Sequence, residues 1–214
     1  KLITLFGIAS GMKYLHAHDI VHRDLKPDNI LVDSNGFLRL TDFGLSLCGI
    51  NGFQMSTRVG TPDYMAPEIV LPQNYSFSCD YWSLGVMTYE MLCGIPPFHG
   101  ETEDETFQKI LIGSMDLSEL EDVSDTCKDF ISKLLIMDPM KRLGASRFEE
   151  IMEHPWFEGI DWDRIQEIEP VFVPDVQDDK QNTYFLSRYE FPDDAELDIR
   201  EDLQDQNNDY SQKE

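Results

Sequence analysis

The sequence is poor in basic residues. It contains 17 lysines and arginines against 41 aspartates and glutamates, which gives a formal net charge of -24 at pH 7. Proteins that bind nucleic acid usually do so through a basic surface that neutralises phosphates, so this balance argues against a nucleic-acid partner. An acidic surface is compatible instead with basic protein partners or with simple solubility.

Other features that mark particular classes of protein are also missing. The four cysteines (Cys48, Cys79, Cys93 and Cys127) are far apart and form no C-x-x-C pair. This spacing argues against a zinc site or a disulfide framework, and it predicts a reducing compartment, the cytoplasm or the nucleus. No apolar run approaches the length that crosses a bilayer and no secretory signal is present, so we expect no membrane partner.

The apolar residues that are present predict a mainly α-helical fold. They recur at steps of three and four over residues 2–15 and again over residues 127–135, as in amphipathic helices. Residues 81–93 are apolar almost all round and stop at Gly94, which predicts a central, buried helix. A shorter helix is expected around Phe107.

Elsewhere the sequence predicts shorter or irregular structure. Two apolar runs, residues 30–32 and 37–40, flank an Asn-Gly turn, which is a strong local signal of a β-hairpin. Ser146 with Glu149 three residues later resembles a capping box that opens one more helix. Residues 41–78 are irregular and rich in Gly, Thr, Ser and Pro, and a stretch of that length inside a domain is usually functional.

One polar stretch contains the residue types that a phosphoryl-transfer site needs. Residues 22–29 read HRDLKPDN. A solvated turn between two buried elements would explain their polarity, but not the order of the residue types. Phosphoryl transfer requires a carboxylate to orient the attacking hydroxyl, a cation near the transferred phosphate and oxygen ligands for a metal. Asp24, Lys26 and Asn29 supply these three types in one loop, and the triplets D-F-G (42–44) and A-P-E (66–68) follow.

Taken together, H-R-D-L-K-P-D-N, D-F-G and A-P-E in this order resemble the eukaryotic protein kinases. The resemblance implies transfer of the γ-phosphoryl group of ATP to Ser or Thr hydroxyls of protein substrates, with ATP and Mg²⁺ as cofactors. It implies that Asp24 orients the substrate hydroxyl or accepts its proton. Lys26 would stabilise the charge on the transferred group, and Asn29 and Asp42 would hold the magnesium ions.

The resemblance also implies a nucleotide site. Leu31 would form the apolar floor beneath the adenine, although an ordinary core residue of the hairpin would give the same pattern. Phe185 would cap the adenine from a C-terminal tail. The nucleotide-binding residues expected in full are Lys26, Asp28, Asn29, Leu31, Thr41, Asp42 and Phe185.

The residues between D-F-G and A-P-E imply the type of kinase and its regulation. Lys26 and the segment 60–64 are of the serine/threonine type. Thr57 stands where the AGC group of kinases carries an activating phosphothreonine, and Ser56 is the competing acceptor. Arg23 would bind the phosphate, which an upstream activating kinase or autophosphorylation would add. Alternatively, both hydroxyls are loop residues without a role.

Two further groups of residues are implied by the resemblance. Gly60, Thr61 and Pro62 would contact the protein substrate, and Asp28 and Glu90 would hold a substrate arginine unless they are only solvated charges. The implied structural residues are Asp80, which ties down the catalytic loop, and the buried ion pair of Glu68 and Arg142.

The resemblance divides the chain into a kinase C-terminal lobe (1–158), an AGC-type tail (159–192) and an acidic, disordered end (193–214). The sequences G-I-P-P-F (94–98), D-W (161–162) and T-Y-F (183–185) look most like the microtubule-associated serine/threonine kinases and Greatwall. Leu186 stands where an acidic residue is usual, no F-x-x-F motif follows, and the long insertion typical of Greatwall is missing. The exact subfamily therefore stays open.

The sequence contains no G-x-G-x-x-G loop to cover the phosphates and no strand lysine with its glutamate partner. We therefore expect a helical C-lobe with a short hairpin and a tail, but no N-lobe. Two functions are compatible with that expectation. The chain is the C-terminal part of a serine/threonine kinase whose N-lobe lies upstream, or it is a truncated, non-catalytic binding module. The complete set of Asp24, Lys26, Asn29 and Asp42 favours the kinase.

Overall fold

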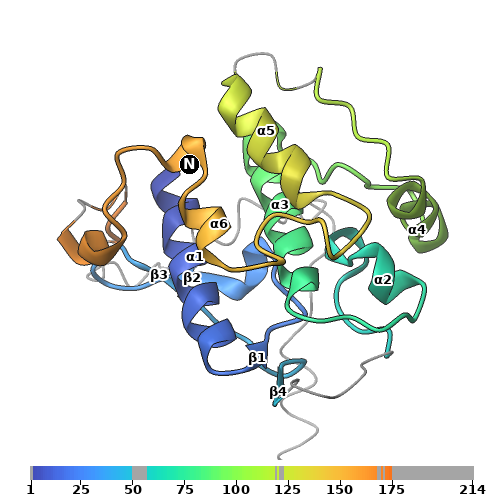
Figure 1. Ribbon diagram of the computed structural model, residues 1–214, viewed down its shortest axis with the longest axis horizontal. Helices are drawn as coiled ribbons and strands as arrows, with labels where there is room; N and C mark the ends of the chain where they lie inside the picture. Colours follow the sequence, from blue (N-terminus) through green and yellow to red (C-terminus); the bar gives the residue numbers. More distant parts are fainter. Residues whose placement is uncertain are drawn as a thin grey trace, which may run out of the picture. The chain divides into compact units, whose positions relative to one another are not determined.

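The computed structural model describes residues 2–49, 57–118, 120, 123–167, 170 and 172–174. The helices are α1 (Leu2–Ala17), α2 (Pro67–Val70), α3 (Ser78–Cys93), α4 (Glu103–Ile112), α5 (Asp125–Leu134) and α6 (Glu149–Met152). The strands are β1 (Ile20–Val21), β2 (Ile30–Val32), β3 (Leu38–Leu40) and β4 (Leu47–Cys48). The 3₁₀ turns are η1 (Pro27–Asn29), η2 (Pro62–Tyr64), η3 (Pro155–Phe157) and η4 (Trp162–Glu167). The predicted mainly helical fold is confirmed (Figure 1).

Helix α3 is the centre of the hydrophobic core. Every residue from Ser78 to Tyr89 is buried, and both α1 and α5 pack against this helix (Figure 1). A Cβ atom on Gly85 would lie 2.9 Å from the Cβ of Leu134, so the glycine allows α5 to approach closely. The helix ends at Gly94, whose φ of 90° is in the left-handed region that glycine tolerates. The predicted central helix is therefore confirmed, with its start at Ser78.

The predicted hairpin is also present and rests on α1. Strands β2 and β3 pair antiparallel with Leu31 opposite Arg39. Gly36 closes the turn with a φ of 85° and donates its N–H to the carbonyl of Asp33. On the α1 side, a Cβ atom on Gly11 would lie 2.9 Å from Leu40 Cδ1, so a glycine face of the helix supports β3.

Two local features differ from the sequence prediction. Strands β1 and β4 form a second antiparallel pair, with Ile20 opposite Cys48, and β4 lies in the stretch 41–78 that was predicted to be irregular. The capping box of Ser146 and Glu149 was wrong, because α6 begins after Phe148, which makes no side-chain cap. The true side-chain caps among the described residues are Thr102 on α4, Ser124 on α5 and His154 on η3.

No helix in the described part of the chain combines the length and the apolar character needed to span a membrane. Of the predicted divisions, the acidic end (193–214) and residues 175–192 of the predicted tail lie outside the described residues.

A buried ion pair links the end of the A-P-E triplet to the segment after α5. Arg142 donates from Nη1 and Nη2 to the two carboxylate oxygens of Glu68, at 2.8 and 3.1 Å. The two side chains are 0% and 2% exposed. Arg142 also donates to the carbonyls of Ser78 (2.6 Å) and Ile136 (3.1 Å), and its guanidinium lies 5.1 Å from the ring centroid of Trp82. One side chain thus connects α2, the start of α3 and the segment after α5.

We expect Arg142→Ala to lower the free energy of unfolding by about 3–5 kcal/mol, because the Glu68 carboxylate would remain buried without its partner. Arg147 provides the control, since its pair with Glu153 is exposed, and Arg147→Ala should cost far less than Arg142→Ala. Urea denaturation followed by circular dichroism measures both. Equal losses in the two variants would contradict the structural role of the buried pair.

Candidate active site

A buried carboxylate fixes the start of the HRDLKPDN loop. Asp80, in the first turn of α3, is fully buried. Its Oδ2 accepts the backbone N–H of His22 and its Oδ1 accepts that of Arg23, both at 2.9 Å. Arg23 has a φ of 70°, a left-handed conformation that a non-glycine residue adopts at a cost. The carboxylate holds the backbone in that conformation and so determines where Asp24 points.

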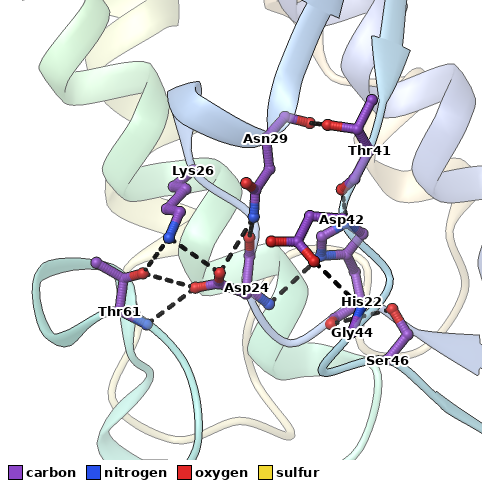
Figure 2. Close-up of polar contacts among 9 residues, drawn as sticks. All are labelled: His22, Asp24, Lys26, Asn29, Thr41, Asp42, Gly44, Ser46 and Thr61. Carbon is purple, nitrogen blue, oxygen red and sulfur yellow. Dashed lines mark hydrogen bonds and ion pairs between the residues drawn. The ribbon is translucent and has the colours of Figure 1, made fainter. Parts of the chain in front are cut away.

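Three polar residues, Thr61, Lys26 and Asn29, surround the carboxylate of Asp24 (Figure 2). Asp24 Oδ1 accepts hydrogen bonds from the backbone N–H of Thr61 at 2.9 Å and from its hydroxyl at 2.7 Å. Lys26 Nζ lies 3.0 Å from Asp24 Oδ2 and donates to the Thr61 hydroxyl at 2.7 Å. Asn29 Nδ2 donates to Asp24 Oδ2 at 3.1 Å. The loop and the segment after D-F-G are thus joined through one carboxylate.

These contacts determine the charge of Asp24. Its partial burial raises the pKa, but the hydrogen bonds from Thr61 and Lys26, the charge of Lys26 and the hydrogen bond from Asn29 lower it, and the net result is a lowered pKa. Asp24 is therefore ionised at neutral pH. An ionised carboxylate accepts a hydrogen bond from a hydroxyl and so can orient it.

Asn29 and Asp42 provide oxygen ligands beside this cluster. The backbone carbonyl of Asn29 accepts the N–H (2.9 Å) and the hydroxyl (3.1 Å) of Thr41, which brings the residue before Asp42 next to the loop. Asp42 is exposed, has a φ of 58° and accepts the N–H of Gly44 at 3.2 Å with one oxygen. The amide oxygen of Asn29 and the second carboxylate oxygen of Asp42 fit Mg²⁺, which is commonly bound by one or two protein oxygens together with phosphates.

The predicted nucleotide-binding residues are only partly described. Leu31 is 44% exposed, so it is not an ordinary core residue of the hairpin. Phe43 is also exposed, at 49%. Its exposure leaves an apolar surface beside the catalytic loop. Asp28 is exposed in η1. Phe185 lies outside the described residues.

The structure brings Arg23 and Thr57 to a common partner, Tyr75. Arg23 donates from Nε to the carbonyl of Leu45 (2.5 Å) and from Nη1 to the Tyr75 hydroxyl (3.1 Å). That hydroxyl donates to the carbonyl of Thr57 at 3.2 Å. The Thr57 residue is exposed, and Ser56 lies outside the described residues. Tyr75 was not found by sequence reasoning, because no local pattern links it to either residue.

The predicted substrate-binding residues surround Tyr64. Glu90 accepts the Tyr64 hydroxyl at 2.7 Å. Burial raises the pKa of Tyr64, and the charges of Glu90, Asp28 and Asp63 raise it further. Asp28 and Glu90 are therefore both close enough to Tyr64 for their charges to act on its hydroxyl. Asp63 is a third carboxylate near Tyr64, and the sequence analysis missed it. Its oxygen lies 2.9 Å from His99 Nδ1.

Residues 4–157 match the family model described as the protein kinase domain. The chain belongs to the protein kinase family. It is 38% identical to "Probable serine/threonine protein kinase IRE4" of Arabidopsis thaliana, with 87% of this chain and 21% of the relative covered. It is 41% identical to "Serine/threonine-protein kinase sgk-1" of Caenorhabditis elegans (79% and 37%) and 42% identical to "Protein kinase C delta type" of Rattus norvegicus (79% and 25%).

This kinase chain thus spans about a fifth to two-fifths of the length of these relatives. Its relatives place it with the serine/threonine kinases, as the sequence analysis predicted. The three motifs identified in the sequence, at residues 22–29, 42–44 and 66–68, all lie inside the matched residues.

The lowered pKa of Asp24 leads to a pH prediction. A carboxyl whose pKa is lower in the folded state stabilises the fold above its ordinary value of 3.8, and this contribution disappears as pH falls through the lower folded value. We therefore expect Asp24→Asn to lose less stability than the wild type between about pH 5 and pH 3. Thermal unfolding at fixed pH values measures this, with Asp104→Asn on α4 as the control. An equally steep loss in Asp24→Asn would contradict the assignment.

Proposed function

We propose that the chain is the C-lobe and tail of a serine/threonine protein kinase that transfers the γ-phosphoryl group of ATP to protein hydroxyls. The observation that supports this best is the cluster of Asp24, Lys26 and Thr61, joined by bonds of 2.7–3.0 Å, beside Asn29. It combines an ionised carboxylate, a cation and two candidate metal ligands on neighbouring backbone segments. A non-catalytic binding module does not need these groups next to one another, and no observation favours that alternative.

Each residue has a distinct part in the proposed reaction. Asp24 accepts a hydrogen bond from the substrate hydroxyl and aligns it for attack. Lys26, already held between Asp24 and Thr61, places a positive charge next to the transferred group. Asn29 and Asp42 would hold Mg²⁺, which neutralises phosphate charge when it is bound with ATP. Catalysis in this scheme is mainly positioning and electrostatics.

The remaining parts of the active site would come from an N-lobe upstream of this chain. The sequence has no Gly-rich loop or strand lysine to hold the phosphates. A groove of about 1040 Å³ lies between α1 and the β2–β3 hairpin, and it is lined by Tyr14, Val32 and Phe43. These side chains are 64%, 41% and 49% exposed. An apolar surface of this kind usually contacts another part of a protein, which supports the proposal that a further lobe covers it.

The finer assignments are also part of the proposal. Among the serine/threonine kinases, we propose that the chain belongs to the AGC group and is most similar to the microtubule-associated serine/threonine kinases and Greatwall. Residues 159–192 would form the AGC-type tail. An upstream kinase or autophosphorylation would modify Thr57 or Ser56, and Arg23 would bind the phosphate. The protein would act in the cytoplasm or the nucleus.

The catalytic assignment is tested in the protein expressed from its complete reading frame. Asp24→Ala and Asp42→Ala should each reduce phosphorylation of a generic peptide by about a thousandfold, because each removes a group that positions the reacting atoms. Asp104→Ala, an exposed carboxylate on α4, should retain activity. Radiolabel transfer from ATP measures all three. Near-normal turnover in either active-site variant would exclude the proposed roles.

Substrate choice is tested with peptides that carry arginine before the target serine. Asp28→Asn and Glu90→Gln should each raise KM for such peptides by about tenfold or more, since a hydrogen bond to a charged group contributes about 1.5–3 kcal/mol. KM for a peptide without arginine should not change. Glu103→Gln on α4 is the control for loss of a surface charge. If the wild type shows no preference for arginine in a peptide library, the assignment is wrong.

A further inference from the structure

Arg58 follows the proposed phosphorylation site and makes two contacts outside its own segment. Its Nη2 donates to the carbonyl of Val70 at 2.6 Å. Its guanidinium carbon lies 4.9 Å from the centroid of the Phe107 ring, within the range of a cation–π interaction. Val70 is the last residue of α2, and Phe107 is a buried residue of α4. One exposed arginine therefore ties the backbone at residue 58 to two helices.

Both anchors belong to helices that pack against each other. Helix α2 is fully buried and packs against α4, and α4 also packs against η2, which carries the segment onward. The Val70 carbonyl is at the C-terminal end of a helix, where a positive side chain is favoured by the helix dipole and by the unpaired carbonyls. Neither contact involves a carboxylate or a phosphate. The attachment is thus independent of the modification state of Thr57.

The same segment reaches the catalytic carboxylate three residues later. Gly60 has a φ of 116°, and a Cβ atom there would lie 2.8 Å from the carbonyl oxygen of Arg23. Thr61 then binds Asp24 through both its N–H and its hydroxyl. The backbone between Arg58 and Thr61 is therefore held at both ends, and a displacement at Arg58 would be transmitted to Thr61.

We propose that Arg58 is a positioning residue of the substrate-binding segment, which holds Thr61 against Asp24 and Lys26 whether or not Thr57 is phosphorylated. This inference rests on the proposed kinase function. It assigns two separate supports to the segment. The Tyr75 hydroxyl, with Arg23, holds the carbonyl of Thr57, and Arg58 holds the next residue to α2 and α4.

The first test is steady-state kinetics of the protein expressed from its complete reading frame. Arg58→Ala should lower kcat/KM for a peptide substrate by about tenfold, because Thr61 would no longer be fixed beside the reacting hydroxyl. KM for ATP and the melting temperature should not change. The matched control is Arg39→Ala, which removes an exposed arginine of the hairpin that pairs with Asp33. Unchanged peptide kinetics in Arg58→Ala would overturn the proposal.

Two further variants separate this role from phosphate binding and from general stability. In a Thr57→Ala background, Arg58→Ala should cause the same fold-loss; a loss that disappears would show that Arg58 acts through the phosphate. Arg58→Lys keeps a cation that can lie over the ring and should recover part of the activity. If Arg58→Lys is as inactive as Arg58→Ala, the cation over the Phe107 ring contributes nothing to positioning the segment.

Hydrogen–deuterium exchange gives a readout that does not need catalysis. Amides of residues 57–64 should exchange faster in Arg58→Ala than in the wild type, whereas those of α3 should not change. If the wild type transfers no phosphate but this difference is present, the kinase proposal fails and the positioning role stands. If the wild type is active and exchange in the segment is unaffected, the positioning role fails alone.

Discussion

The active-site geometry depends on one buried carboxylate, that of Asp80. It accepts the backbone N–H groups of His22 and Arg23, and His16 Nε2 lies 2.8 Å from the same oxygen that His22 uses. Asp80 lies in the first turn of α3, where a negative charge is favoured by the helix dipole. Three partners and a helix terminus compensate for burying the charge, which would otherwise be costly. The centre of the core and the start of the HRDLKPDN loop are therefore one connected structure.

Side-chain hydrogen bonds also join chain segments that are distant in sequence. Thr61 is separated from Asp24 by 37 residues, yet it gives two hydrogen bonds to that carboxylate. Glu68 and Arg142 join positions 74 residues apart, also through two hydrogen bonds, here one to each carboxylate oxygen. Paired hydrogen bonds fix orientation as well as distance. The irregular part of the chain is thus held by side chains, not by regular secondary structure.

Sequence patterns predicted the features that depend on local periodicity. The period of the apolar residues predicted α1 and α5, the nearly continuous apolar stretch that stops at Gly94 predicted α3, and the Asn-Gly turn predicted the β2–β3 hairpin. The order of the three motifs was enough to predict the protein kinase family, because each motif keeps its residues within eight positions. These features are encoded over a few neighbouring residues.

Contacts between distant residues were not predictable in the same way. The pairing of β1 with β4 involves two residues on each side, too few for an alternating pattern. Tyr75, Asp63 and Arg58 each contact a partner far away in the sequence, and nothing in the neighbouring sequence distinguishes them from other residues of their type. The failed capping box of Ser146 shows the converse case, in which a correct local pattern is not used.

The glycine face of α1 has a consequence for the spacing of the active site. Leu40 rests where a Cβ atom on Gly11 would intrude, and Asp42 follows Leu40 by two residues. Asp24, in contrast, is placed from the other side by α3 through Asp80. The two candidate groups are therefore supported by different helices, Asp42 through the packing of β3 on α1 and Asp24 through the hydrogen bonds of the loop to α3. A methyl group added at Gly11 would come within 2.9 Å of Leu40 Cδ1, so the Leu40 side chain would have to move away from α1.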